Sequence, residues 1–116
     1  MSWLRGADAE TRALRHLEAR GLKLLARNWR CRGGELDLVM RDGETLAIIE
    51  VRSRSRADFG SAFESVDARK RGHLIHAAQL FLAAHAEHHT REVRFDVVAL
   101  DGGQLQWLKA AFDAGG

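Results

Sequence analysis

Apolar residues recur along the chain at two spacings, one typical of helices and one of strands. Residues 7–20 have the spacing of an amphipathic helix, which Gly21 ends. The expected apolar stripe of this helix is Ala7, Leu14 and Leu17. A second helix is predicted over 64–88, with a stripe of Leu74, Ala77, Ala78, Phe81 and Leu82. We therefore expect two long helices, each with one buried face.

Five segments have the two-residue period of β-strands. They are residues 22–30, 35–41, 44–52, 93–100 and 104–108. Residues 53–63 are polar and rich in Arg, and we interpret them as a mobile loop before the second helix. The predicted order is therefore α-β-β-β-α-β-β, an α/β fold with a mixed sheet flanked by helices.

The dipeptide Asp42-Gly43 predicts a tight hairpin between the second and third strands, because a type I′ turn needs two residues of positive φ. Such a turn pairs Arg41 with Glu44. On one face this register opposes Val39 with Leu46, Asp37 with Ile48, and Glu35 with Glu50. The other face carries Leu36, Leu38, Met40, Ala47, Ile49 and Val51. Apolar residues on both faces predict a sheet covered by helices on both sides.

The chain has 116 residues, of which 46% are hydrophobic. This length allows one domain, residues 1–116, with one packed core, and the apolar fraction is too high for a disordered chain. No apolar run approaches the roughly 18 residues of a membrane-spanning helix. We therefore expect a soluble globular protein without a membrane partner.

Charge and cysteine content indicate which binding partners and which cellular compartment to expect. The 18 basic residues exceed the 16 acidic ones only slightly, but 15 of the 18 are Arg. Guanidinium groups match phosphate oxygens well, which makes nucleic acid a candidate partner. Cys31 has no second cysteine to pair with, and the amino terminus lacks the apolar stretch of a signal peptide. We expect a reduced, cytoplasmic setting.

Three carboxylates stand where the periodicity predicts apolar residues: Glu10 on the first helix, Asp37 on the second strand and Glu50 on the third. A buried ionised carboxylate needs a partner charge or a metal ion. Acids from adjacent strands form an oxygen-rich site for a hard divalent cation such as Mg²⁺ or Mn²⁺. Such an ion suits phosphodiester hydrolysis. We expect the three acids to converge at one edge of the sheet, on the face covered by the first helix.

A competing interpretation gives these acids structural roles. Glu10 would be a first-turn acid favoured by the helix dipole, and Asp37 and Glu50 would pair with arginines across the hairpin. Acids on strands form ion pairs more often than they bind metals. The residue spacing alone leaves both interpretations open.

Two short motifs favour the metal interpretation. Residues 34–39 have the sequence GELDLV, and residues 49–54 have the sequence IEVRSR. The pair closely resembles the PD-(D/E)XK nuclease signature, an acid on one strand followed by Glu-X-Lys on the next. The Holliday junction resolvase-like branch of these nucleases is the most similar.

The order of motifs along the whole chain is similar to that of the bacterial YraN family. That pattern has a helix with Gly-X-X-X-Glu, then Arg-Asn, Gly-Glu-Ile-Asp-Leu, Val-Glu-Val-Lys, a helical Lys, and Arg-Phe-Asp. The corresponding residues here are Gly6 with Glu10, Arg27-Asn28, 34–38, 49–52, Lys70, and 94–96. The match covers about a hundred residues in the same order, which makes the resemblance specific.

The resemblance implies a restriction-endonuclease-like fold and a set of metal ligands. Asp37 and Glu50 would bind the ion through their carboxylates, the Val51 carbonyl would be a further ligand, and Glu10 would complete the acidic patch. Arg52 would stand in the place of the lysine. Because Arg stays protonated, it can supply only the electrostatic part of the role of that lysine.

Other basic residues complete the expected site. Lys70 on the second helix is either a relocated catalytic lysine or a phosphate contact within Arg69-Lys70-Arg71. Arg52, Arg54 and Arg56 alternate as the chain leaves the third strand, a pattern suited to holding a phosphate backbone. The nucleic-acid contacts expected are therefore Arg54, Arg56, Arg69 and Arg71. The role of Asp96, within the Arg-Phe-Asp motif, stays open.

The leading hypothesis is a metal-dependent nuclease acting on DNA, with branched or damaged DNA indicated by the resolvase resemblance. The alternative is a nucleic-acid-binding module of the same fold with weak or lost catalysis, which Arg52 favours. A third class is a protein-interaction domain with a structural acid cluster. A resolvase-like enzyme that cuts two strands symmetrically is expected to form a homodimer.

Overall fold

The computed structural model describes residues 6–54, 59–101 and 103–115. The two long helices and five strands follow one another in the predicted order. Their bounds are α1 Gly6–Glu18, β1 Lys23–Cys31, β2 Gly34–Asp42, β3 Thr45–Arg54, α3 Ala68–Ala84, β4 Val93–Asp101 and β5 Gln104–Phe112. A short helix α2, Phe59–Glu64, precedes α3, and a 3-10 turn, Ala86–His88, follows it. The α-β-β-β-α-β-β prediction is confirmed.

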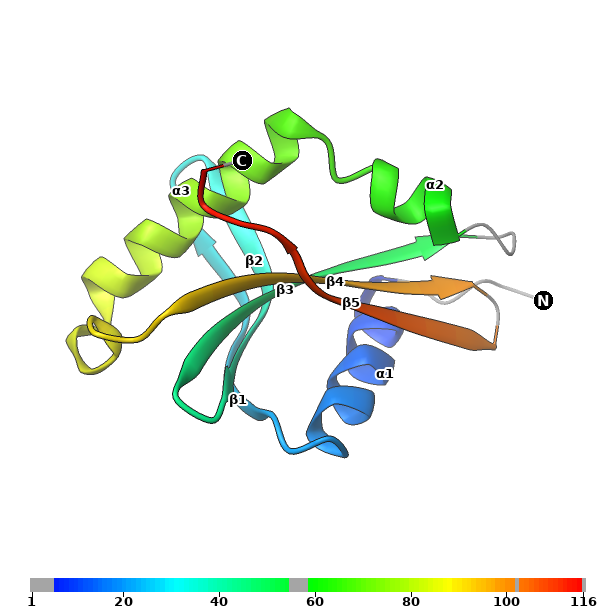
Figure 1. Cartoon of the computed structure of the whole chain (residues 1–116), viewed down its shortest axis with the longest axis horizontal. Coiled ribbons are helices and arrows are strands. Elements are labelled where there is room, and N and C mark those ends of the chain that lie inside the picture. The colour runs from blue at the N-terminus through cyan, green and yellow to red at the C-terminus, as the bar shows by residue number, and fades with distance from the viewer. Residues whose placement is uncertain (1–5, 55–58, 102, 116) are drawn as a thin grey trace.

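The strands form one sheet in the order β1-β2-β3-β4-β5. Strands β3 and β4 are parallel, whereas the other neighbours are antiparallel. A parallel pair needs a crossover connection, and here α2 and α3 provide it. Figure 1 shows α1 on one side of the sheet and α2 with α3 on the other. The predicted mixed sheet, covered by helices on two sides, is therefore present.

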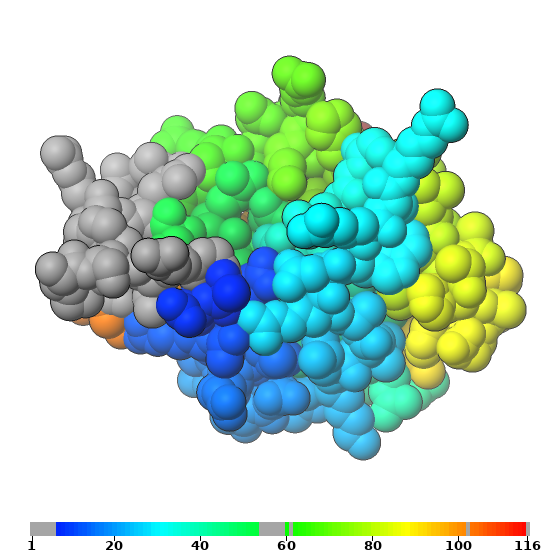
Figure 2. All heavy atoms as spheres, turned by 180° about the vertical axis from the view of Figure 1, so that it is seen from behind, coloured from blue at the N-terminus to red at the C-terminus, as the bar shows by residue number. Residues whose placement is uncertain are grey.

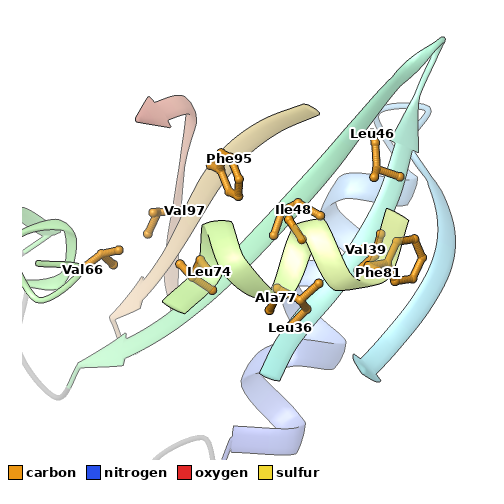
Figure 3. Packing of buried hydrophobic residues seen from close by; sticks show 11 residues of the cluster. Leu36, Val39, Leu46, Ile48, Val66, Leu74, Ala77, Phe81, Phe95 and Val97 are labelled. Atoms are coloured by element: carbon orange, nitrogen blue, oxygen red, sulfur yellow. The ribbon is translucent and has the colours of Figure 1, made fainter. Parts of the chain in front are cut away.

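Helix α3 packs on one face of the sheet and forms the larger core. Phe81 and Leu74 of α3 lie over Val39, Ile48 and Phe95, as Figure 3 shows. The buried residues of this cluster are Leu36, Val39, Leu46, Ile48, Val66, Leu74, Ala77, Ala78, Phe81, Phe95 and Val97. The predicted stripe of the second helix is confirmed at Leu74, Ala77, Ala78 and Phe81, with Leu82 partly buried beside them.

Helix α1 packs on the opposite face. Its buried residues are Ala9, Ala13 and Leu17, and Leu14 packs against them, whereas Ala7 is exposed. The strand residues beneath α1 are Leu38, Met40, Ala47, Ile49, Val98 and Leu100. The expectation that the first helix covers the face of Val39, Leu46 and Ile48 is therefore wrong. The exposed Ala7 shows that the helix is turned from the predicted orientation.

The second helix is shorter than the sequence predicts. It begins after Asp67, whose side chain accepts a hydrogen bond of 2.9 Å from the backbone N–H of Lys70. This cap satisfies a free helical N–H, so the chain can bend between α2 and α3. Part of the predicted 53–63 loop is α2, and residues 55–58 lie outside the described residues. No described helix is long and apolar enough to cross a membrane.

The hairpin between β2 and β3 has a different register from the predicted one. Asp42 pairs with Thr45, so Gly43 and Glu44 are the two turn residues. Only Gly43 has a positive φ, 60°, which fits a type II′ turn with glycine in the first central position. The pairing of Asp37 with Ile48 is therefore wrong. The observed pair Leu38–Ile49 instead sets Asp37 next to Glu50, its neighbour across the strands.

A shift of two residues keeps side chains on their predicted faces, with one exception. Leu36 was expected beside Leu38 and Met40, but it packs with Val39 in the cluster beneath α3. The alternation of β2 is therefore interrupted between Leu36 and Val39. Asp37 lies within this interruption, where an ordinary strand residue would have a fixed inward or outward direction.

Candidate functional site

Strands β2 and β3 separate where the acids lie. Their pairing ends at Leu38–Ile49, although β2 continues to pair with β1 as far as Gly34. Beyond that point, Asp37 Oδ2 accepts a hydrogen bond of 2.9 Å from the backbone N–H of Val51. A carboxylate therefore takes the place of a backbone acceptor. This opening between two strands gives polar side chains room inside the sheet.

Glu50 is almost completely buried, with 5% of its side chain exposed. Its Oε2 atom lies 2.9 Å from Arg52 Nη2 and 3.5 Å from Lys70 Nζ. Its other oxygen, Oε1, is buried and has no hydrogen-bond donor within reach. A buried carboxylate oxygen without a donor is costly, so Oε1 is the least satisfied acceptor of the site.

The surroundings of Glu50 favour its protonated form. Burial, and then the negative charge of Asp37, raise the pKa of Glu50 from 4.5 to about 7. Lys70 and Arg52 act in the opposite direction and only partly offset the rise. Asp37 is also a hydrogen-bond partner of the Glu50 carboxyl group, which raises the pKa of Glu50 further. The two neighbouring carboxyl groups therefore favour a state in which one proton lies between them.

Glu10 approaches the same place from the first turns of α1. Only 12% of its side chain is exposed, and burial together with the negative charge of Asp37 raises its pKa. Arg27 partly offsets this effect, with its Nε atom 3.4 Å from Glu10 Oε1. Asp37 thus interacts with both other acids. The acids therefore form two neighbouring pairs that share Asp37, Glu10 with Asp37 and Glu50 with Asp37, near the point where β2 and β3 separate.

Arginines do pair with two of these acids, but not across the β2–β3 hairpin as the structural interpretation expected. Glu10 pairs with Arg27 of β1, and Glu50 pairs with Arg52 of its own strand. Asp37 accepts its hydrogen bond from a backbone N–H. The observed ion pairs therefore partly neutralise Glu10 and Glu50, and Asp37 has a backbone partner instead.

The expected basic residues fall into three groups. Lys70 reaches Glu50 from the first turn of α3 and belongs to the site, whereas its neighbour Arg69 is exposed. Arg71 has different partners. Its Nε atom donates to the Val66 carbonyl at 2.9 Å, and its guanidinium lies over the Phe112 ring. The Arg54 side chain and the whole of Arg56 lie outside the described residues.

The donor set fits a divalent cation only with help from other oxygens. Among the described residues, no three His, Cys, Asp or Glu side chains are grouped closely enough to hold a metal ion. Asp37 and Glu50 are paired carboxylates, and the unpartnered Glu50 Oε1 offers a lone pair that no protein donor uses. With the Val51 carbonyl, a bound phosphate and water, they match the oxygen ligands that Mg²⁺ prefers.

Arg27 and Asn28 have no role predicted from the sequence, yet both influence Glu10. Asn28 has a positive φ of 52° within β1, and its side chain lowers the pKa of Glu10. Propensity and period do not reveal such a backbone conformation. The only available signal was the adjacent Arg-Asn pair in the family-like pattern.

Asp96 forms a separate network on β4. Its carboxylate, in a residue with only 1% exposure, accepts two hydrogen bonds of 2.9 Å from Arg94. It accepts two more from Trp107 Nε1 at 3.1 Å and from the backbone N–H of Ala110 at 2.9 Å. Both oxygens are fully used, so this acid links β4 to β5 and has no capacity left for a ligand.

Comparisons with known proteins identify the relatives of the chain. The family model described as "Uncharacterised protein family UPF0102" matches residues 9–100, which include all three acids. A UPF0102 protein of Pseudomonas fluorescens is 53% identical over 114 residues, covering 94% of this chain and 93% of that protein. One of Pseudomonas entomophila is 55% identical over 113 residues, covering 93% and 92%. The chain therefore belongs to the UPF0102 family, the YraN family that its motifs resemble.

Proposed function

We propose that the protein hydrolyses phosphodiester bonds in DNA with a divalent ion, Mg²⁺ or Mn²⁺, held by Asp37 and Glu50. One observation carries this proposal. Glu50 Oε1 is buried without a donor and shares its surroundings with a second carboxylate, while both cations of the site lie at Oε2. A structural acid would be paired on both oxygens. An unused oxygen beside another acid suits a positive ion from solution.

Each residue of the site has a distinct part in this proposal. Asp37 and Glu50 would hold the ion, with the Val51 carbonyl as a further ligand and Glu10 adding negative charge nearby. When bound, the ion supplies Lewis-acid chemistry: it lowers the pKa of a bound water and offsets charge on the phosphate. Asp37 is kept in place by the Val51 N–H, and Glu50 by Arg52 and Lys70.

Arg52 and Lys70 divide the work that one lysine does in the nuclease signature. Arg52 remains protonated and can only stabilise negative charge that develops on the phosphate. Lys70 Nζ, 3.5 Å from Glu50 Oε2 and one-third exposed, would orient the attacking water by donating a hydrogen bond to it. We therefore assign electrostatic stabilisation to Arg52 and the water-handling role to Lys70.

DNA as the substrate is supported by the excess of Arg and by the family-like motifs around the acids. Figure 2 shows that α1, the β1–β2 hairpin and the chain of α2 and α3 meet on one face of the molecule. The side chains of the site come from these elements and from β3. Branched or damaged DNA, cut by a homodimer, is the finer form of the proposal.

The direct test is a cleavage panel of four-way junction, flap, duplex and single-stranded DNA with Mg²⁺ or Mn²⁺. The wild-type protein should cut at least one substrate, EDTA should stop the reaction, and Asp37→Asn and Glu50→Gln should remove it. Glu35→Gln is the matched control, because Glu35 is an exposed acid on β2 that pairs with Arg30 outside the site. Loss of activity in this control would contradict the assignment.

The alternative is a DNA-binding module without catalysis. The close Arg52–Glu50 ion pair favours it, because a guanidinium at 2.9 Å already neutralises one acid of the site. If wild-type protein and Arg52→Lys both fail to cut any substrate yet bind DNA, this alternative replaces the nuclease. If neither cleavage nor DNA binding is found, the acid cluster is structural or serves a protein partner.

A further inference from the structure

Asn28 has an unusual backbone conformation at the edge of the acid site. It lies in the middle of β1, between the pairs Arg27–Leu38 and Trp29–Leu36, and therefore opposite Asp37. Its φ of 52° falls in the left-handed region, which most residues with a side chain avoid and which asparagine adopts more readily than they do. A conformation of this kind persists where the surrounding structure requires it, and it is concentrated at functional sites.

The conformation of Asn28 changes where two neighbouring side chains point. Consecutive residues of a regular strand face opposite sides of the sheet. Here both Arg27 and Asn28 influence Glu10: Arg27 Nε lies 3.4 Å from Glu10 Oε1, and the Asn28 side chain lowers the pKa of the same carboxyl group. The left-handed residue therefore brings two consecutive side chains to one acid.

Arg27 also fixes the helix that carries Glu10. Its Nη2 atom donates to the Ala7 carbonyl and to Thr11 Oγ1, each at 2.8 Å. These two acceptors lie on either side of Glu10 along α1. One guanidinium thus holds both the first turns of the helix and its acid against β1.

Glu10 lies where two features of the fold disfavour a carboxylate, and Arg27 is the ion-pair partner that offsets them. Asp37 repels it, and burial disfavours its charged form. Without a donor, the side chain would gain by turning away toward water. The position of Glu10 near Asp37 therefore depends on Arg27 and Asn28 of β1.

We infer that Arg27 and Asn28 are positioning residues that clamp Glu10 in the acid site. This inference rests on the proposed function, since Glu10 matters there as the third acid near the divalent ion. The clamp acts through Glu10 and does not itself touch the ion. Its test is therefore whether effects of changes at Arg27 and Asn28 depend on the presence of Glu10.

The experiment combines Asn28→Gly and Arg27→Gln, each alone and with Glu10→Gln. Glycine accepts the positive φ, so Asn28→Gly removes the carboxamide without adding strain. Mn²⁺ affinity is measured by calorimetry. We expect each single variant to weaken Mn²⁺ binding by about tenfold, the scale typical for residues that orient a ligand, and to have no further effect in Glu10→Gln.

Ala110→Gly is the matched control. Ala110 on β5 has a similar positive φ of 54° but lies in the Asp96 network. It should leave Mn²⁺ affinity unchanged. Equal losses of affinity with and without Glu10, or a loss in Ala110→Gly as large as in Asn28→Gly, would overturn the clamp.

A second measurement separates failure of the clamp from failure of the proposed function. The urea midpoints of the metal-free variants are compared in the same cycle. We expect Arg27→Gln to lower the midpoint more when Glu10 is present than in Glu10→Gln, because the partner of the guanidinium is then missing. Additive shifts would overturn the clamp. Wild-type protein that binds no Mn²⁺ but shows the non-additive shift would overturn the metal site and keep the clamp.

Discussion

Glu50 and Asp96 are both buried acids on neighbouring strands, but they are satisfied to very different degrees. Asp96 accepts four hydrogen bonds, from Arg94, Trp107 and the Ala110 backbone, and both its oxygens are used. Glu50 contacts two cations through Oε2, while Oε1 has no donor, and the nearby Asp37 carboxylate raises the pKa of Glu50. The hydrogen bonding of Asp96 is therefore complete, whereas that of Glu50 is not.

This difference in hydrogen bonding distinguishes a structural acid from a candidate functional acid without reference to the sequence motifs. A network in which every acceptor is used adds stability and has nothing left to bind. An incomplete buried site costs stability, which proteins tolerate at places that bind or react. The comparison predicts opposite results when the two acids are neutralised.

Removing Asp96 should have the largest effect. Asp96→Ala leaves the Arg94 guanidinium, the Trp107 N–H and the Ala110 N–H without their common acceptor. We expect a loss of about 4 kcal/mol in the free energy of unfolding, the usual scale for breaking a buried ion pair. Urea denaturation measures it, with Asp96→Asn as the milder variant if the alanine variant does not fold. A loss below that of Glu50→Gln would remove the contrast between the two sites.

Neutralising Glu50 should change how stability depends on pH. The pKa of Glu50 is raised in the folded protein from 4.5 to about 7, so the folded state binds the proton more tightly than the unfolded state. The metal-free wild-type protein therefore loses about 3 kcal/mol as pH rises from 4.5 to 7. Glu50→Gln should lack this loss and be the more stable protein at pH 8. Parallel stability curves for the two proteins would show that Glu50 does not carry the effect.

The next effect in order of size is expected on the affinity for divalent ions, which should distinguish the two sites. Asp37→Asn and Glu50→Gln should each weaken Mn²⁺ binding by about a hundredfold, beyond the tenfold typical of an orienting residue. Glu35→Gln should leave it unchanged. Calorimetry at pH 8, where Glu50 is ionised, is the measurement. Unchanged affinity in both site variants would refute the metal assignment.

We expect the smallest effects from changes to Arg52 and Lys70, the two cations that contact Glu50. Arg52→Lys should preserve or raise cleavage, and Arg52→Ala should lower it without removing Mn²⁺ binding. Lys70→Ala should remove activity even in the Arg52→Lys background if Lys70 handles the water. A Lys70 that only contacts phosphate would instead weaken substrate binding, with recovery at low salt.

The element order and most buried faces could be predicted from the sequence because they follow from local period. The stripe of α3 and the alternation of β3 are examples. The hairpin register was missed because Asp42-Gly43 suits type I′, whereas the chain places Gly43 first in a type II′ turn. The choice depends on packing of both strands, which a dipeptide does not contain.

The candidate site was only partly visible in the sequence. The three acids stand out because they interrupt apolar patterns, and the structure places Asp37 near each of the other two. The left-handed Asn28 and the face chosen by α1 depend on contacts between distant elements. Asp96 could not be placed, because its partners Trp107 and Ala110 belong to a strand predicted to end at residue 108.

The parallel pairing of β3 with β4 also determines the order in which these sites are built. All three acids lie on α1, β2 and β3, which contact through nearby antiparallel hairpins. Strand β4 is separated from its partner β3 by the connection that contains α2 and α3, and closing so long a loop is slow. The acids therefore meet early, and the Asp96 network forms after the rate-limiting step. Loss of Asp96 should consequently speed unfolding and leave the folding rate nearly unchanged.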